Sequence, residues 1–108
     1  MIVTRNDVRA LVDQEYAAAE AAYPPVHSLH EGYAILLEEF EEAEEALGLA
    51  KDRLRRLWTA VRADDLRRAH ALTVPIQAYS EQVACEALQS AAVCRRILDF
   101  LQKEGKKG

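Results

Sequence analysis

The first stretch of the sequence carries apolar residues at the three- and four-residue spacing of an amphipathic helix. It begins at Thr4, where the hydroxyl of Thr4 and the carboxylate of Asp7 fit a capping pattern. It ends before Pro24-Pro25, because neither proline can donate the backbone hydrogen bond that a helix needs. These signals predict a helix over residues 4–23.

A second periodic stretch opens at Ser28, which with Glu31 fits a capping box. Apolar residues then recur in steps of three and four to Arg62, and only Gly48 interrupts them. One glycine costs about 1 kcal/mol relative to alanine, too little to end so regular a pattern. We therefore expect one helix over residues 28–62, with Gly48 as the point where it would break.

The third stretch follows a turn at which Asp64 or Asp65 supplies the next N-cap. It predicts a helix over residues 65–102 and a frayed tail beyond. Pro75 lies inside this range. We expect a kink or break near Pro75, the break being a fresh start with Thr73 as the N-cap.

Together these elements predict an all-α fold and a single helical domain over residues 1–108. The two long helices should fold back on each other as an antiparallel hairpin that turns at residues 63–64. A helix of ~35 residues is about 52 Å long, whereas a compact domain of this size has a radius of gyration of ~13 Å. The short N-terminal helix cannot cover both arms, so we expect a homo-oligomer, a dimer or tetramer, to complete a helical bundle.

Composition supports the helical interpretation and limits the partners. Hydrophobic residues make up 50% of the chain, with only four glycines and three prolines. The net charge of −4 disfavours a nucleic-acid polymer as partner. No run approaches the ~18 apolar residues of a membrane span, so we expect no membrane association.

The two cysteines, Cys85 and Cys94, indicate whether the protein resides in a reducing or an oxidising cellular compartment. Nine residues apart in a helix, they lie on opposite faces and cannot bridge each other. We expect two buried thiols in a reducing compartment. The N-terminal residues show no basic region followed by an apolar one, so we expect no signal peptide and a cytoplasmic protein.

An acidic segment at residues 38–45 holds six glutamates in eight positions. The simplest interpretation is a solvated face. However, six carboxylates on so short a helical segment cannot all face outward, and like charges one turn apart repel. Glu38, Glu39 and Glu42 share one side of the helix, and something positive should lie near that side.

In the predicted hairpin, Glu86 and Gln89 arrive level with this acidic side. Glu86 stands in an otherwise apolar stretch, where a buried carboxylate needs a partner. Carboxylates converging between two helices suit Mg²⁺ or Mn²⁺. The sequence has no zinc-ligand pattern, phosphate-binding glycine loop or Ser-His-Asp arrangement, so phosphoryl and pyrophosphoryl transfer come first among the chemistries.

The order of these motifs resembles the MazG-like nucleotide pyrophosphohydrolases, in which Glu-Glu-x-x-Glu on one helix precedes Glu-x-x-Asp on the next. His30–Ile35 leading into Glu38–Glu42, and later Glu86–Ala92, is similar to a branch common among phage and prophage proteins. The resemblance covers residues 28 to 100 and leaves the first helix unassigned.

The resemblance implies Mg²⁺-dependent hydrolysis of a nucleoside triphosphate to the monophosphate and pyrophosphate. By position, Glu39 and Glu42 match the metal-binding pair and Glu86 the first acid of the second motif. Glu38 matches the leading acid, as a further ligand or as the base that orients water. Gln89 stands where the family places aspartate; its amide oxygen can coordinate a metal, but it carries no charge and cannot act as a base.

Two other functions remain open at this point. The chain could be a non-catalytic helical assembly protein of phage or prophage origin that keeps the MazG-like fold but has lost turnover at Gln89. It could also be a helical partner-binding protein whose acidic face is merely solvated. The residues that would bind a substrate are not identified by the sequence.

Overall fold

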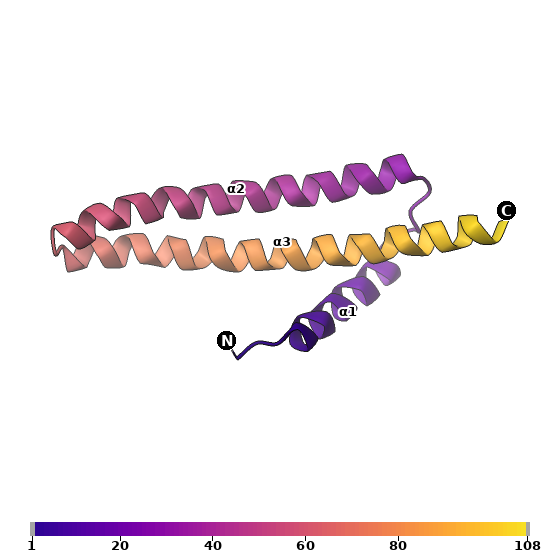
Figure 1. Cartoon of the computed structure of the whole chain (residues 1–108), viewed down its shortest axis with the longest axis horizontal. Coiled ribbons are helices and arrows are strands. Elements are labelled where there is room, and N and C mark those ends of the chain that lie inside the picture. Colours follow the sequence, from indigo (N-terminus) through magenta and orange to yellow (C-terminus); the bar gives the residue numbers. More distant parts are fainter. Residues whose placement is uncertain (1, 108) are drawn as a thin grey trace. The chain divides into compact units, whose positions relative to one another are not determined.

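A computed structural model describes residues 2–107, and over this range the chain forms helices and no strand (Figure 1). Helix α1 spans Arg5–Ala22, α2 spans Leu29–Arg62 and α3 spans Leu66–Lys107. The all-α prediction is confirmed.

The chain divides into two compact units. The three-helix unit comprises Met1–Phe40 and Glu86–Gly108, and the hairpin unit comprises Glu41–Cys85. Both long helices contribute to both units. The prediction of a single domain over residues 1–108 stays a prediction.

The starts of α1 and α2 are fixed by local side-chain hydrogen bonds. At α1, the Thr4 hydroxyl accepts from the Asp7 amide (3.2 Å) and the Asp7 carboxylate accepts from the Thr4 amide (2.8 Å), which confirms the predicted capping box. At α2, the Ser28 hydroxyl accepts from the Glu31 amide (3.1 Å). The Glu31 carboxylate, however, accepts from the amide of His27 instead of Ser28 (3.1 Å), so only half of the predicted box forms.

In the hairpin unit, α2 and α3 form antiparallel arms joined by a tight turn (Figure 1). Asp64 adopts a left-handed conformation with φ of 52°, which reverses the chain. Asp65 is the N-cap of α3, since its carboxylate accepts from the amide of Arg68 (3.0 Å). Of the two candidates for this cap, the structure selects Asp65.

Neither long helix is interrupted. Gly48 lies inside a continuous α2, as the sequence favours. Pro75 lies inside a continuous α3, so the predicted alternative of a fresh start is wrong. Thr73 is not an N-cap, because its hydroxyl donates back to the carbonyl of Ala69 (2.7 Å) from within the helix. The predicted frayed tail is also wrong, since α3 continues to Lys107.

The three-helix unit has a small core of buried apolar side chains. Its buried apolar side chains come from α1, from the connection after α1 and from α3: Val12, Val26, Ala92 and Val93. Gly32 of α2 lies so close to α3 that a Cβ there would come within 2.8 Å of Ile97 Cγ1. The missing side chain of this glycine therefore allows α2 to approach α3 closely at this point.

Polar contacts attach α1 to α3 within the three-helix unit. The Arg95 guanidinium donates to the Asp13 carboxylate and lies over the Tyr16 ring, 4.0 Å from its centroid. The Tyr16 hydroxyl donates to the Asp99 carboxylate. Because Val12 is the one buried side chain of α1, these contacts orient a helix that buries little apolar surface.

Both cysteines are free thiols. Cys94 is half-buried but Cys85 is exposed, so the prediction of two buried thiols is wrong for Cys85. No helix within residues 2–107 combines the length and apolarity needed to cross a bilayer.

Candidate metal centre

Two helices of the three-helix unit supply facing polar side chains at helical spacing. On α2, Glu31 and Glu39 are eight residues apart, about two turns, and so lie on one side of the helix. On α3, Glu86, Gln89 and Arg96 recur at spacings of three and seven residues and likewise share a side. Helix periodicity thus gathers both sets into one region of the unit.

The central relationship is between Glu39 of α2 and Glu86 of α3. A carboxylate oxygen of each lies within 4.8 Å of the other, and both residues are half-buried. Two negative charges at this separation repel, and a low-dielectric surrounding strengthens the repulsion. A divalent cation held by both carboxylates would turn this repulsion into attraction.

Glu39 adds an independent sign that a ligand is needed. Its Oε2 atom is buried and accepts no hydrogen bond from any residue in the range 2–107. A buried carboxylate oxygen without a partner is costly and rare in folded proteins. Oxygen donors of this kind fit a hard cation such as Mg²⁺ or Mn²⁺.

The other predicted ligands have different positions. Glu42 follows Glu39 by three residues on the continuous α2, so it leaves the helix on the same side; it is exposed and belongs to the hairpin unit. Gln89 is half-buried and lines the same cavity as Glu39, as the predicted register requires. Glu38 is exposed and does not line that cavity.

A cavity of about 420 Å³ opens beside Glu39, and every residue of its lining belongs to the three-helix unit. This volume is in the range of small-molecule sites. Of the predicted site residues, Glu39 and Gln89 line it, whereas Glu86 does not. The full lining also includes parts of α1 and its connection to α2: Glu15, Ala19, Tyr23, Pro24, Glu31, Ile35, Glu39, Gln89, Val93 and Arg96. The contribution of α1 was not predicted, because the first helix was left unassigned.

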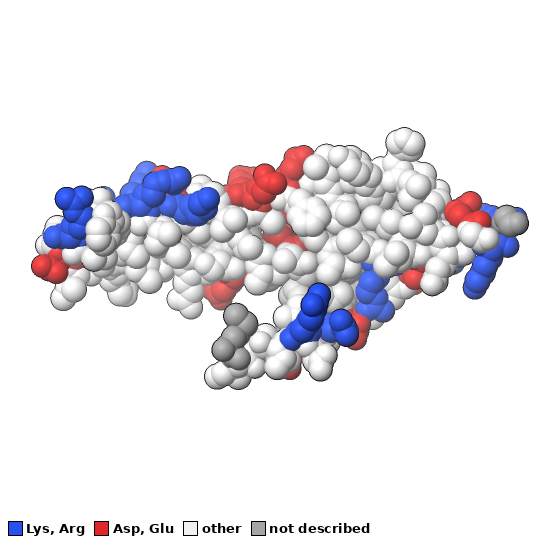
Figure 2. Space-filling view, in the orientation of Figure 1, with Lys and Arg blue, Asp and Glu red and all other residues white. Residues whose placement is uncertain are grey.

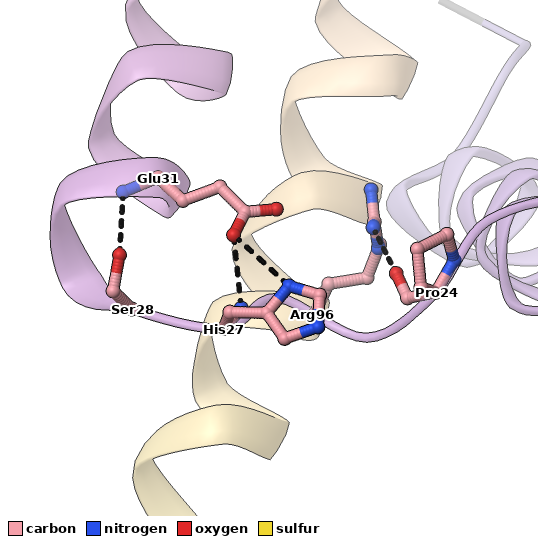
Figure 3. Close-up of polar contacts among 5 residues, drawn as sticks. All are labelled: Pro24, His27, Ser28, Glu31 and Arg96. Atoms are coloured by element: carbon pink, nitrogen blue, oxygen red, sulfur yellow. Dashed lines mark hydrogen bonds and ion pairs between the residues drawn. The ribbon is translucent and has the colours of Figure 1, made fainter.

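Arg96 is the single basic side chain among the described residues that line the cavity. Its Nη2 donates to the carbonyl of Pro24 (3.0 Å), as Figure 3 shows, and its guanidinium lies 5.9 Å from the centroid of the Tyr23 ring. The seven-residue spacing from Gln89, two helical turns, is a sequence signal that could have placed Arg96 at the site.

Glu31 lies at the edge of this cavity near the start of α2. Its Oε2 contacts both the backbone amide of His27 (3.1 Å) and the His27 ring Nδ1 (3.3 Å), while its own amide is capped by Ser28 (Figure 3). The side chain is therefore anchored toward the connection. Its role in the structure is to fix the beginning of α2 beside Arg96.

Comparison with known proteins finds no matching protein family, no matching curated protein and no matching solved structure. Function is therefore inferred from the residues of the chain itself.

Proposed function

We propose that the protein is a Mg²⁺- or Mn²⁺-dependent nucleoside triphosphate pyrophosphohydrolase of MazG-like type. The observation that carries the proposal is the Glu39–Glu86 pair, in which one buried oxygen of Glu39 accepts no hydrogen bond from residues 2–107. The resemblance of the acidic motifs to that family supplies the reaction. The products would be a nucleoside monophosphate and pyrophosphate.

Glu39 and Glu86 would hold the cation, with Glu42 and the amide oxygen of Gln89 as further ligands. Bound there, the cation would neutralise the charge of the substrate phosphates. Glu38, exposed beside Glu39, would orient the attacking water or join as a ligand. This assignment gives each acidic residue of the first motif a role that its helical position allows.

The cavity is large enough for part of a nucleotide, and its lining carries one positive charge, that of Arg96. Arg96 is held at the cavity wall by its hydrogen bond to the Pro24 carbonyl, and the other N–H groups of the guanidinium could donate to a phosphate. Neighbouring Tyr23 offers an aromatic surface beside the same cavity. These features support a phosphorylated substrate of small size.

The direct test is release of pyrophosphate from a panel of ribo- and deoxyribonucleoside triphosphates in Mg²⁺ or Mn²⁺. Glu39→Gln and Glu86→Gln should each reduce turnover by a hundredfold or more, on the order of 3 kcal/mol in the barrier. Glu45→Gln, an exposed glutamate of the same segment, is the matched control and should retain activity. Turnover that survives Glu39→Gln would refute the assignment.

The second candidate is a non-catalytic helical assembly protein of phage or prophage origin. Gln89 favours it, since an amide replaces the acid that the resemblance leads one to expect. Gln89→Asp separates the two candidates. Hydrolysis that appears only in Gln89→Asp would identify the natural chain as the non-catalytic form, whereas hydrolysis by the natural chain would exclude that candidate.

We also propose that the protein is a cytoplasmic homo-oligomer, a dimer or tetramer that completes a helical bundle. The support is the length of the two helices relative to α1, together with the large apolar side chains that remain exposed on α2. Sedimentation of the full chain measures the subunit number.

A further inference from the structure

On the α2 arm of the hairpin unit, the buried side chains are small and several large apolar side chains are exposed. The buried side chains of its α2 arm are Ala46, Ala50 and Ala60. Four large apolar side chains of the same arm are about half exposed or more, at 49% for Leu47, 56% for Leu54, 60% for Trp58 and 50% for Val61, whereas Leu49 and Leu57 are less exposed. This distribution is the reverse of what a helix pair that functions alone would show.

These four exposed side chains form one stripe. Their spacings of seven, four and three residues place them within about 60° of one another around α2, at roughly 100° per residue. We call Leu47, Leu54, Trp58 and Val61 the outer stripe. A contiguous apolar surface that includes an exposed tryptophan is typical of an interaction site.

Along one flank of the outer stripe, a negative charge comes first and positive charges follow. Glu44 lies at its N-terminal end, whereas Lys51, Arg55 and Arg62 follow toward the turn. In Figure 2, acidic side chains gather over the middle of α2 and basic ones over the part next to the turn. No ion pair among residues 2–107 uses any of these four charges.

We infer that the outer stripe binds the outer stripe of a second copy of this chain, with the two α2 helices antiparallel. A two-fold axis perpendicular to the helices brings the same flank of both copies together, so the flanks must complement themselves. With the axis near Lys51, Glu44 of one copy lies level with Trp58 of the other, between Arg55 and Arg62. The two copies of Lys51 lie level with each other at the axis, so the favourable contacts of this flank are those of Glu44. In parallel packing, with the axis along the helices, this flank of the two copies would instead lie on opposite sides of the contact, so these charges would not meet.

The arrangement also matches the apolar residues. Around the same axis, Leu47 of one copy lies near the level of Leu54 of the other, and the reverse contact is identical by symmetry. Apolar side chains that are half exposed in one chain would then be buried between two chains. The inference goes beyond the proposed hydrolase and holds whether or not the chain binds metal or nucleotide.

The first test is sedimentation velocity of the full chain over a wide range of concentrations. We expect a concentration-dependent dimer, and Leu54→Glu and Trp58→Glu should each raise its Kd by about a hundredfold or more. Val74→Glu is the matched control, since Val74 is 55% exposed on the other arm of the hairpin. Circular dichroism verifies that each variant remains helical.

The second test is a charge exchange that reports the direction of packing. Glu44→Arg alone and Arg55→Glu with Arg62→Glu should each weaken the dimer, and all three together should restore it. Restoration requires that residue 44 meet residues 55 and 62 across the interface. A chain that stays monomeric, a dimer insensitive to Trp58→Glu, or a triple variant weaker than either set alone would each overturn the inference.

Discussion

The hydroxyl of Tyr16 on α1 donates a hydrogen bond to the carboxylate of Asp99 on α3, across 83 positions of sequence. This bond raises the pKa of Tyr16 to about 12; desolvation of the phenol and the negative charges of Asp99 and Glu20 add to it. The neutral phenol is thereby favoured in the folded protein, and α1 is attached to α3 by a contact that depends on this proton.

The pH dependence of stability follows from this pKa. Because the folded pKa exceeds the unfolded value of ~10, the contribution of Tyr16 is fully present below pH ~10 and is lost as pH rises through about 12. Tyr16→Phe should therefore be less stable than wild type at neutral pH, and the difference should shrink in strong alkali. Urea denaturation of both proteins along a pH series measures it; a constant difference would contradict this account.

The two glycines of α2 should respond to alanine in opposite directions. At Gly32 a new Cβ would come within 2.8 Å of Ile97 Cγ1, so Gly32→Ala should lower the free energy of unfolding by about 1–2 kcal/mol despite the better helix propensity. At Gly48 a new Cβ meets nothing within 4 Å, so Gly48→Ala should raise it by about 0.5–1 kcal/mol. Denaturant unfolding of the two variants measures both changes. Equal changes in the free energy of unfolding would show that α2 and α3 are not close at Gly32.

Pro75 costs stability that alanine should recover. Proline inside a helix removes one backbone hydrogen bond and crowds the preceding turn, yet α3 continues through it. Pro75→Ala should raise the free energy of unfolding by about 1–3 kcal/mol. Val74→Ala, one position earlier and exposed, serves as the control and should change stability by less than about 0.5 kcal/mol.

Substitutions at the two aspartates of the hairpin turn should change the free energy of unfolding in opposite directions. Asp64 has a positive φ, so Asp64→Gly should relieve strain and raise the free energy of unfolding by about 0.5–1 kcal/mol. Asp65 caps α3, so Asp65→Ala should lower it by about 1 kcal/mol. Thermal denaturation of both variants against wild type checks the signs, and a loss at Asp64→Gly would rule out strain at that residue.

Divalent metal should stabilise the protein through Glu39 and Glu86. If only the folded state binds the cation, a free cation concentration of a hundred times Kd adds about 2.7 kcal/mol to the free energy of unfolding. For a domain of this size, that raises the Tm by several degrees. Thermal unfolding in EDTA and then in Mg²⁺ or Mn²⁺ measures the shift.

The matched variants locate the effect. Glu39→Gln and Glu86→Gln should each abolish the metal-dependent shift, while Glu45→Gln should keep it. Without metal, Glu39→Gln should not be less stable than wild type, because it removes repulsion from Glu86. A shift that persists in both site variants would place the cation elsewhere.

Regular helices explain why the sequence could predict the position of Glu86 beside Glu39. Once Pro24-Pro25 and the turn at Asp64 mark the ends, the rise per residue of a continuous helix fixes which residues lie level. Gly48 and Pro75 do not interrupt α2 and α3, so the predicted register holds for this pair.

Three predictions from local sequence patterns differ from the structure: the capping box at Ser28, the frayed tail and the fresh start near Pro75. The Glu31 carboxylate accepts from the amide of His27, whereas the capping box pattern assigns it to the amide of Ser28. The tail to Lys107 stays helical although its composition predicts fraying. Pro75 disfavours a helix locally, but α3 is one continuous helix of 42 residues that includes it.

The sequence by itself determined the helices, the cap at Thr4 and the approach of Glu39 to Glu86, because each depends on neighbours in the chain or on helix geometry. It left Asp64 and Asp65 as alternatives for the cap of α3, and the structure selects Asp65. Only the tertiary structure decided where α1 lies and which residues it brings to the cavity. The bond from Tyr16 to Asp99 and the contact of Arg96 with Pro24 join positions more than seventy residues apart. No spacing rule reaches across such a distance, since these contacts depend on the path of the chain between α1 and α2.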